Sequence, residues 1–168
     1  MIGQAEQQFR AASYVESFVL VRNGFLIQGL YYTAAGIFTN DDIASVTKSI
    51  MSSLVGIALQ QGYLDRLGQK LMDFFPEYST PTLDSTKYLI TIEDLLTMRP
   101  GFDYDESQDH SDLFNTGTNW MKEGIDLPMK GVPGDTFNYV SIDAHLVSGI
   151  LTKTSHMSTK DLATTYLL

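Results

Sequence analysis

The apolar and polar positions divide the chain into a short strand-forming part and a longer helical part. Apolar residues at near-helical spacing predict a short amphipathic helix over residues 3–13. Residues 17–22 and 25–32 are predicted to be strands. They are joined by Asn23-Gly24, a pair that tolerates the positive φ angles of a tight hairpin turn. The chain is therefore predicted to begin with a helix and an antiparallel hairpin.

The predicted hairpin does not account for a complete sheet. Residues 19–21 are apolar without alternation, which predicts that both faces of the first strand are covered. Two strands are too few for a stable open sheet. Either the hairpin joins strands from elsewhere, or the chain is a piece of a larger protein.

Helical periodicity begins after a loop over residues 33–42. The strongest predicted helix covers residues 45–61 and ends at Gly62. The residues predicted to line its apolar face are Val46, Ile50, Leu54, Ile57, Ala58 and Gln61. A shorter helix is predicted over residues 67–75, ended by Pro76.

Two further helices follow, separated by a broken polar segment. Thr91 is predicted to cap a helix that closes at Pro100-Gly101, because Asp94 lies three residues further on. Residues 101–134 are rich in Asp, Asn and Gly and show little periodicity. A last helix is predicted over residues 141–153, with an apolar side made by Leu146, Val147, Ile150 and Leu151.

Composition and charge favour a single domain with a buried core and disfavour several classes of function. The chain has 168 residues and 43% hydrophobic content, enough for one domain with a buried core. Its net charge of -9 disfavours nucleic acid and anionic membranes as partners. It has no cysteine, hence no disulfide, no thiolate metal site and no cysteine nucleophile.

No targeting or spanning segment is recognisable in the chain as written. The N-terminus lacks a basic region followed by an apolar stretch, and no apolar run reaches the length of a membrane helix. We therefore expect a soluble protein without a signal peptide. It would be periplasmic or secreted in a bacterium if a leader had been removed, and otherwise cytoplasmic.

Ser45 and Lys48 form a Ser-x-x-Lys tetrad where the loop becomes a helix. Residues at i and i+3 share a helix face, so the hydroxyl and the amine can meet. The positive end of the helix dipole, together with burial, disfavours the ammonium form of Lys48 and favours the neutral amine that acts as a base. The alternative is that Ser45 is a helix cap and Lys48 a solvated residue of the first turn.

At this point the sequence resembles a known family. The matching segments are 45–49 (Ser-Val-Thr-Lys-Ser), 54–65, 74–78 (Phe-Phe-Pro-Glu-Tyr), 91–101 and 137–141 (Phe-Asn-Tyr-Val-Ser). They are similar to the beta-lactamase-related serine hydrolases, which include class C beta-lactamases, family VIII carboxylesterases, penicillin-binding protein-like DD-peptidases and 6-aminohexanoate-oligomer hydrolases. The resemblance covers residue 17 to the C-terminus and implies an α+β fold. Pro100 departs from the family pattern, which often has serine there.

The resemblance implies roles for four residues. Ser45 would be the nucleophile, Lys48 its activating base and Tyr139 the proton relay, while Ser141 would help to hold Lys48 and the substrate. A phenol beside a lysine can share its proton, so either group can deprotonate Ser45. Taken alone, Tyr139 is equally explained as a buried core aromatic with its hydroxyl bonded to the backbone.

The third motif of the family, Lys-Thr-Gly or His-x-Gly on a late strand, is missing. Lys153-Thr154 is not a substitute, because it ends the helix after Tyr139 instead of lying on a strand. We therefore expect residues 1–168 to be the N-terminal portion of such a domain, with a hairpin at 17–32, a mainly helical part at 45–168 and no C-terminal strands. Self-association or a second chain could complete the sheet.

Other chemistries find little support. There is no Gly-x-Ser-x-Gly elbow, and three scattered histidines do not make a zinc site, so we expect no metal and no organic cofactor. Trp120, with Phe114 and Tyr104, could line a substrate cleft, although ordinary loop packing explains these aromatics too.

The sequence thus favours a serine hydrolase that acts through an acyl-enzyme on an ester, an amide or a beta-lactam. The alternative is a catalytically inactive or incomplete member that serves as a binding or structural module. A purely helical interaction module is disfavoured by the hairpin.

Overall fold

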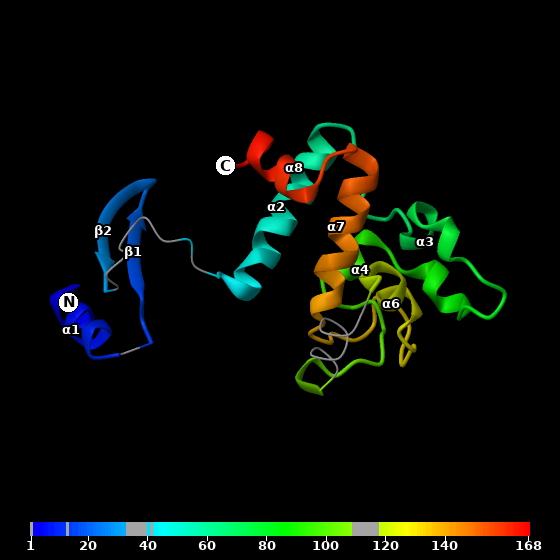
Figure 1. Cartoon of the computed structure of the whole chain (residues 1–168), viewed down its shortest axis with the longest axis horizontal. Coiled ribbons are helices and arrows are strands. Elements are labelled where there is room, and N and C mark those ends of the chain that lie inside the picture. Colours follow the sequence, from blue (N-terminus) through cyan, green and yellow to red (C-terminus); the bar gives the residue numbers. More distant parts are fainter. Residues whose placement is uncertain (1, 13, 33–39, 41, 109–117) are drawn as a thin grey trace. The chain divides into compact units, whose positions relative to one another are not determined.

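A computed structural model describes residues 2–12, 14–32, 40, 42–108 and 118–168. The chain divides into two compact units, Met1–Ile43 and Ala44–Leu168, and each is described by itself (Figure 1). The predicted loop at 33–42 lies almost wholly outside the described residues.

The first unit is a helix followed by a hairpin, as predicted. Helix α1 (Ile2–Ala11) precedes strand β1 (Ser17–Arg22), which pairs antiparallel with β2 (Phe25–Tyr31). Asn23 and Gly24 have φ angles of 52° and 79°, in the left-handed region that a two-residue hairpin turn requires. The hairpin prediction is confirmed.

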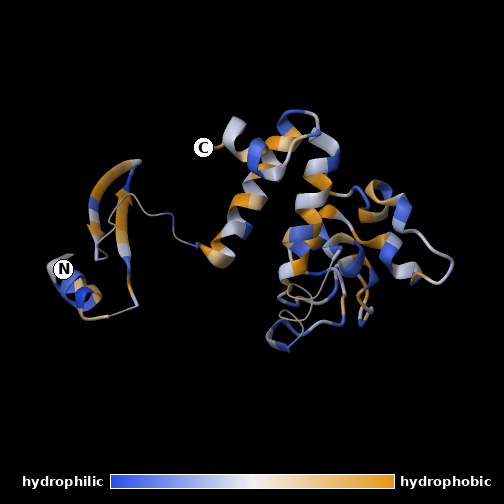
Figure 2. Ribbon diagram, in the orientation of Figure 1, coloured by the Kyte–Doolittle hydropathy of each residue, from blue (hydrophilic) through white to orange (hydrophobic). Residues whose placement is uncertain are grey.

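One side of β1 is more exposed than the sequence predicts. Phe18 is half-buried and stacks on Phe9 of α1 at 4.7 Å, whereas Val19 and Val21 are 51% and 57% exposed. The expectation that both faces of this strand are covered is wrong for the described structure. Figure 2 shows that apolar residues nevertheless continue along both strands. The run of apolar residues reflects strand propensity, and α1 packs on one face only.

The second unit opens with a tight turn where an α-helix was predicted to start. Residues Ala44–Val46 form a 3-10 turn, and the α-helix α2 covers Thr47–Gln60. Ala44 adopts a φ of 43°, an unfavourable conformation for a residue with a Cβ. Gly62, at φ 75°, ends the helix as predicted.

The buried face of α2 differs from the predicted one. Met51, Leu54, Val55 and Ala58 are buried, whereas Val46 is 62% exposed. The apolar face predicted from the sequence was therefore displaced around the helix toward Val46. Leu54 and Ala58 were correctly predicted to be buried. Apolar residues occur on more than one side of this helix, so its neighbours decide which side is buried.

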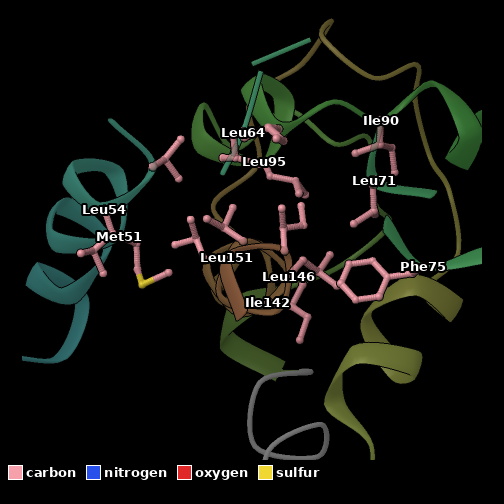
Figure 3. Packing of buried hydrophobic residues seen from close by; sticks show 14 of the residues in the cluster. Met51, Leu54, Leu64, Leu71, Phe75, Ile90, Leu95, Ile142, Leu146 and Leu151 are labelled. Atoms are coloured by element: carbon pink, nitrogen blue, oxygen red, sulfur yellow. The ribbon is translucent and has the colours of Figure 1, made fainter. Parts of the chain in front are cut away.

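Helix α7 (Ser141–Ser155) lies at the centre of the second unit. It contacts α2, α3 (Leu71–Phe74), α4 (Ile92–Leu96), α6 (Trp120–Asp126) and α8 (Thr159–Tyr166). Figure 3 shows Leu146 and Leu151 of α7 inside the apolar cluster, with Leu54 of α2 on one side and Phe75 on the other. The predicted apolar side of this helix is confirmed.

Close packing between α6 and α7 depends on one glycine. A Cβ at Gly124 would lie 2.6 Å from the Cγ1 atom of Ile142, which is fully buried. The two helices can approach this closely only because residue 124 has no side chain.

The segment before α4 contains less α-helix than predicted. Helix α3 has only four residues, so the prediction of a helix over 67–75 is wrong at its N-terminal half. Pro76 ends α3 as expected and starts the 3-10 turn Pro76–Tyr78; a second such turn covers Ser85–Leu89. The Thr91 cap is confirmed, with Thr91 and Asp94 forming a reciprocal capping box.

Helix α8 is absent from the sequence prediction. Its signal is Ser158, whose side chain accepts a hydrogen bond from the backbone N–H of Asp161. Among the helices described, none combines the length and apolar character that a membrane span requires.

Candidate active site

Ser45, Lys48 and Tyr139 come together although 91 or more residues separate Tyr139 from the other two. The Tyr139 hydroxyl donates a hydrogen bond of 2.6 Å to the Ser45 Oγ, and the Lys48 Nζ donates one of 3.1 Å to the same atom. Because Ser45 lies in the 3-10 turn and Lys48 in the first turn of α2, the local backbone places the two on one side of the helix start.

This geometry bears on the alternatives raised by the sequence. The N-terminal cap residue of α2 is Val46, and the Ser45 side chain accepts hydrogen bonds from Lys48 and Tyr139. Tyr139 is 38% exposed, so it is not a core aromatic. The expected convergence is therefore present, while the catalytic roles of the three residues stay predictions.

Ser141 connects Lys48 to an acid that the sequence analysis did not select. Its Oγ accepts a hydrogen bond of 3.1 Å from the Lys48 Nζ and donates one to the Glu106 carboxylate. The other oxygen of Glu106 accepts a 2.8 Å bond from the Ser141 backbone N–H, at the positive N-terminal end of α7. Glu106 lies in the polar segment 101–134, and no spacing in the sequence singles it out.

The lysine also affects the tyrosine directly. The Lys48 Nζ lies 4.7 Å from the centre of the Tyr139 ring. Hydrogen bonding to Lys48, and then to Ser45, lowers the pKa of Tyr139 from its ordinary value, while burial and the Glu106 carboxylate act in the opposite direction. The phenol is thereby brought closer to a pH at which it can exchange protons with its neighbours.

The backbone around Tyr139 is fixed by the neighbouring residues. Val140 is fully buried, and the Asn138 side chain donates a 2.8 Å hydrogen bond to the Tyr104 carbonyl. The Asn138 backbone N–H also donates to the Met98 carbonyl at 2.9 Å. These contacts tie the backbone next to the tyrosine to the turn after α4 and to the start of the broken polar region.

A groove of about 860 Å³ lies beside Tyr139. Its walls are formed by residues 101–107, 130–132 and 136–139. Gly101, at φ 85°, is required here, because a Cβ would lie 2.5 Å from the Gly131 carbonyl oxygen. The groove is large enough for a small organic substrate.

The predicted aromatic contributors to a cleft do not all reach this groove. Tyr104 lines it, whereas Trp120 lies at the start of α6 with its ring edge-on to His145 at 5.2 Å. Phe114 lies outside the described residues. Trp120 is therefore not among the residues that line the groove.

His145, His156 and Lys153 lie in helix α7 or at its end, and the contacts described for them do not include the Ser45 site. His145 is half-buried, and burial lowers its pKa. His156 ends α7 in the left-handed conformation, and His110 lies outside the described residues. Lys153 donates a 2.7 Å hydrogen bond to the Phe74 carbonyl from the last turn of α7. Within the described ranges, no three His, Cys, Asp or Glu residues are grouped to hold a metal ion.

A second acid missed by the sequence analysis lies just inside this site. Asp143, two residues after Ser141, is 1% exposed, and burial raises its pKa well above the usual range. A single acid among apolar residues of a helix was the available signal, because an acid is rarely found at a buried position unless it is paired.

Comparison with known proteins assigns the chain to a family. The sequence profile described as Beta-lactamase matches residues 39–168, so the chain belongs to the beta-lactamase family. Members of this family are generally serine hydrolases. No curated protein matches the chain.

Solved structures share the fold at low sequence identity. A candidate 6-aminohexanoate-dimer hydrolase from Bacillus anthracis has a TM-score of 0.71 at 16% identity, covering 90% of this chain and 43% of that chain. The octameric penicillin-binding protein homologue from Pyrococcus abyssi has a TM-score of 0.78 at 19% identity, covering 99% and 42%. A candidate beta-lactamase from Bacteroides dorei DSM 17855 has a TM-score of 0.70 at 16% identity, covering 99% and 49%.

The fold is thus the α+β fold of beta-lactamase-like proteins, as predicted. The chain spans less than half of the length of each of these three solved structures.

Proposed function

We propose that this chain carries the nucleophile and proton-transfer groups of a serine hydrolase that cleaves an ester or amide through an acyl-enzyme. The observation that carries the proposal is that the Ser45 Oγ lies 2.6 Å from the Tyr139 hydroxyl and 3.1 Å from the Lys48 Nζ. A hydroxyl nucleophile needs a base within hydrogen-bond reach, and in the part of the chain that the structure describes these two groups are in reach.

In the proposed reaction, the O–H bond of Ser45 breaks and its proton moves to Lys48, directly or through Tyr139. The Ser45 Oγ then forms a bond to the substrate carbonyl carbon. When the tetrahedral intermediate collapses, the bond between that carbon and the leaving group breaks. Tyr139 passes a proton to the leaving group, and water later releases the acyl group by the same steps.

The remaining site residues support this chemistry in distinct ways. Ser141 accepts a hydrogen bond from Lys48 and so orients the base, while Glu106 holds Ser141 at the start of α7. The Ser45 backbone N–H is the donor we assign to the developing oxyanion, because the first turn of a helix leaves such groups unpaired. The groove beside Tyr139 would take the substrate, a small ester, amide or beta-lactam.

The test is covalent labelling of the chain by a fluorophosphonate, followed by mass spectrometry, with hydrolysis of p-nitrophenyl butyrate measured in parallel. We expect labelling at Ser45, none in Ser45→Ala, and a loss of about 10²–10⁴-fold in labelling rate in Lys48→Met. Ser53→Ala, an exposed serine two turns along α2, is the matched control and should label like the unchanged chain. Equal labelling of the chain and Ser45→Ala would disprove the proposal.

The parallel assay separates the second candidate function, an incomplete member that binds but does not turn over. This chain spans less than half of the matched structures, which therefore contain segments that have no counterpart here. Labelling at Ser45 without steady hydrolysis would indicate a competent nucleophile in a site whose oxyanion donors are incomplete, because one missing donor costs roughly 10²–10³ in rate.

A further inference from the structure

Asp143 is a buried acid whose position calls for an explanation. It lies in the first turn of α7 and is 1% exposed. Within the described part of the chain, neither of its carboxyl oxygens has a hydrogen-bond partner. Buried carboxyl groups are normally paired, because an unpaired charge in the protein interior is strongly unfavourable.

A small cavity brings Asp143 and Lys48 together. It has a volume of about 20 Å³, and Lys48 and Asp143 are the two lining residues with polar side chains. The rest of the lining is apolar and comes from α2, α7, α4 and the turn that follows α4. This volume suits one water molecule, and such a water would have the lysine and the acid as its polar partners.

Among the described residues, the charged groups around Asp143 come from two neighbouring segments. Lys48 faces it from α2, and Glu106 approaches the first turn of α7 through Ser141. Helix α4 contributes only Leu95 and Leu96 to the cavity. Burial and then the Glu106 carboxylate raise the pKa of Asp143, and the Lys48 ammonium opposes them.

We propose that Asp143 is a positioning residue for Lys48: across one water in this cavity, its carboxyl group shares a proton with the lysine and so sets the pH range over which Ser45 is activated. When Asp143 holds the shared proton, Lys48 is the neutral amine that a base must be. When Lys48 then takes the proton of Ser45, both groups of the pair are protonated; when Asp143 is instead the carboxylate, it favours the ammonium form of Lys48, which cannot accept that proton. Only the link to Ser45 rests on the proposed function; the coupling of Asp143 to Lys48 stands independently of it.

The first test is the pH dependence of fluorophosphonate labelling at Ser45 in the unchanged chain and in Asp143→Asn. Removing the acid should move the labelling midpoint to lower pH by about one pH unit or more, because a carboxylate favours the charged form of its neighbour. The plateau rate should fall as well, since a weaker base activates Ser45 less. A merely structural role would reduce the labelled fraction without moving the midpoint, so an unchanged midpoint in folded Asp143→Asn overturns the proposal.

A matched control is Asp161→Asn, which removes an exposed acid from α8, outside this site. It should leave both the midpoint and the plateau unchanged. An equal shift of the midpoint in Asp161→Asn would mean that net charge, not the cavity, sets the profile, and would also overturn the proposal.

The second test needs no substitution and no activity. In isotope-edited NMR of the unchanged chain, a coupled pair gives inflections at the same pH in the signals of the Asp143 carboxyl carbon and the Lys48 Cε. Independent single steps would overturn the proposal. If Ser45 cannot be labelled at any pH, the proposed function fails, while this titration still decides whether Asp143 and Lys48 are coupled.

Discussion

Among single residues, Tyr139 has a pKa that depends on its neighbours, and this dependence can be measured by titration. Its pKa is lowered mainly by hydrogen bonding to Lys48. We expect the phenolate absorbance of Tyr139, obtained as the difference between the chain and Tyr139→Phe, to develop at higher pH when Lys48→Met is present. The reason is that the substitution removes the group that stabilises the phenolate.

Tyr88, an exposed tyrosine whose hydroxyl hydrogen-bonds Ser79, supplies the control for that titration. The difference curve for Tyr88→Phe should be the same with and without Lys48→Met. A Tyr139 curve that does not move would show that the lysine does not act on the phenol in solution.

Lys87 is a buried residue whose charge affects the free energy of unfolding. It is 3% exposed, its Nζ donates to the Leu127 carbonyl, and its Nζ lies 5.1 Å from the centre of the Phe102 ring. Burial lowers its pKa to about 8, although the carboxylates of Asp126 and Asp84 counteract this. The folded chain therefore releases the Lys87 proton at a lower pH than the unfolded chain. In the unfolded chain, lysine side chains have a pKa of about 10.4.

The sign of the resulting pH dependence follows from proton binding. Between about pH 8 and 10.4 the unfolded chain binds more protons at Lys87, so this residue makes stability rise with pH in that window. Below pH 8 the contribution is constant. Urea unfolding of Lys87→Met should show a smaller rise between pH 8 and 10 than the unchanged chain, and an identical rise would refute the assignment.

At the level of elements, α4 shows a cap that both the sequence and the structure support. The Thr91 side chain accepts from the Asp94 backbone N–H at 3.0 Å, and Asp94 accepts from the Thr91 backbone N–H at 2.8 Å. Thr91→Ala removes one half of this pair, and we expect a loss of about 1 kcal/mol in the free energy of unfolding by urea.

The control for this substitution is Thr164→Ala on α8. Thr164 is exposed, and its hydroxyl only bonds back to the Lys160 carbonyl within the same helix. Its substitution should change the unfolding free energy by less than about 0.5 kcal/mol. Equal effects at both positions would mean that the capping box contributes nothing particular to α4.

Element prediction succeeded where the signal was local. The Asn23-Gly24 turn and the Thr91 cap each depend on a few adjacent residues, and both were predicted. Prediction of the buried face failed for α2, because this helix has apolar residues on several sides. Packing against α7 decides which side is buried. Helix α8 was missed, although Ser158 and Asp161 have the spacing of an N-terminal cap.

At the level of the whole molecule, the hairpin carries exposed apolar surface. Val21 of β1 and Leu26 of β2 are paired across the hairpin and are 57% and 65% exposed. Exposed apolar strands with free edges promote pairing between chains. We therefore expect the chain to self-associate with increasing concentration in size-exclusion chromatography with light scattering.

The matched variant is Val21→Lys with Leu26→Glu, which places opposite charges across the strand pair and so preserves the hairpin. It should remain monomeric over the same range of concentrations. Association that is unchanged by the two substitutions would show that another surface is responsible.

The sequence by itself determined the class of fold, the hairpin and the presence of a Ser-x-x-Lys tetrad at the start of a helix. It also selected Tyr139 and Ser141, through their order in the family pattern. These features depend on turn conformation, helix spacing and short motifs, all of which involve residues close together in the chain.

Only the tertiary structure decided which side chains surround that tetrad. The Glu106 carboxylate reaches Ser141 across 35 residues, and Lys48 reaches Ser141 across 93. Asp143 lines the same cavity as this lysine because α2 and α7 pack together and leave a space between their side chains. No local rule encodes such contacts, since burial and the pairing of distant charges depend on how whole helices pack.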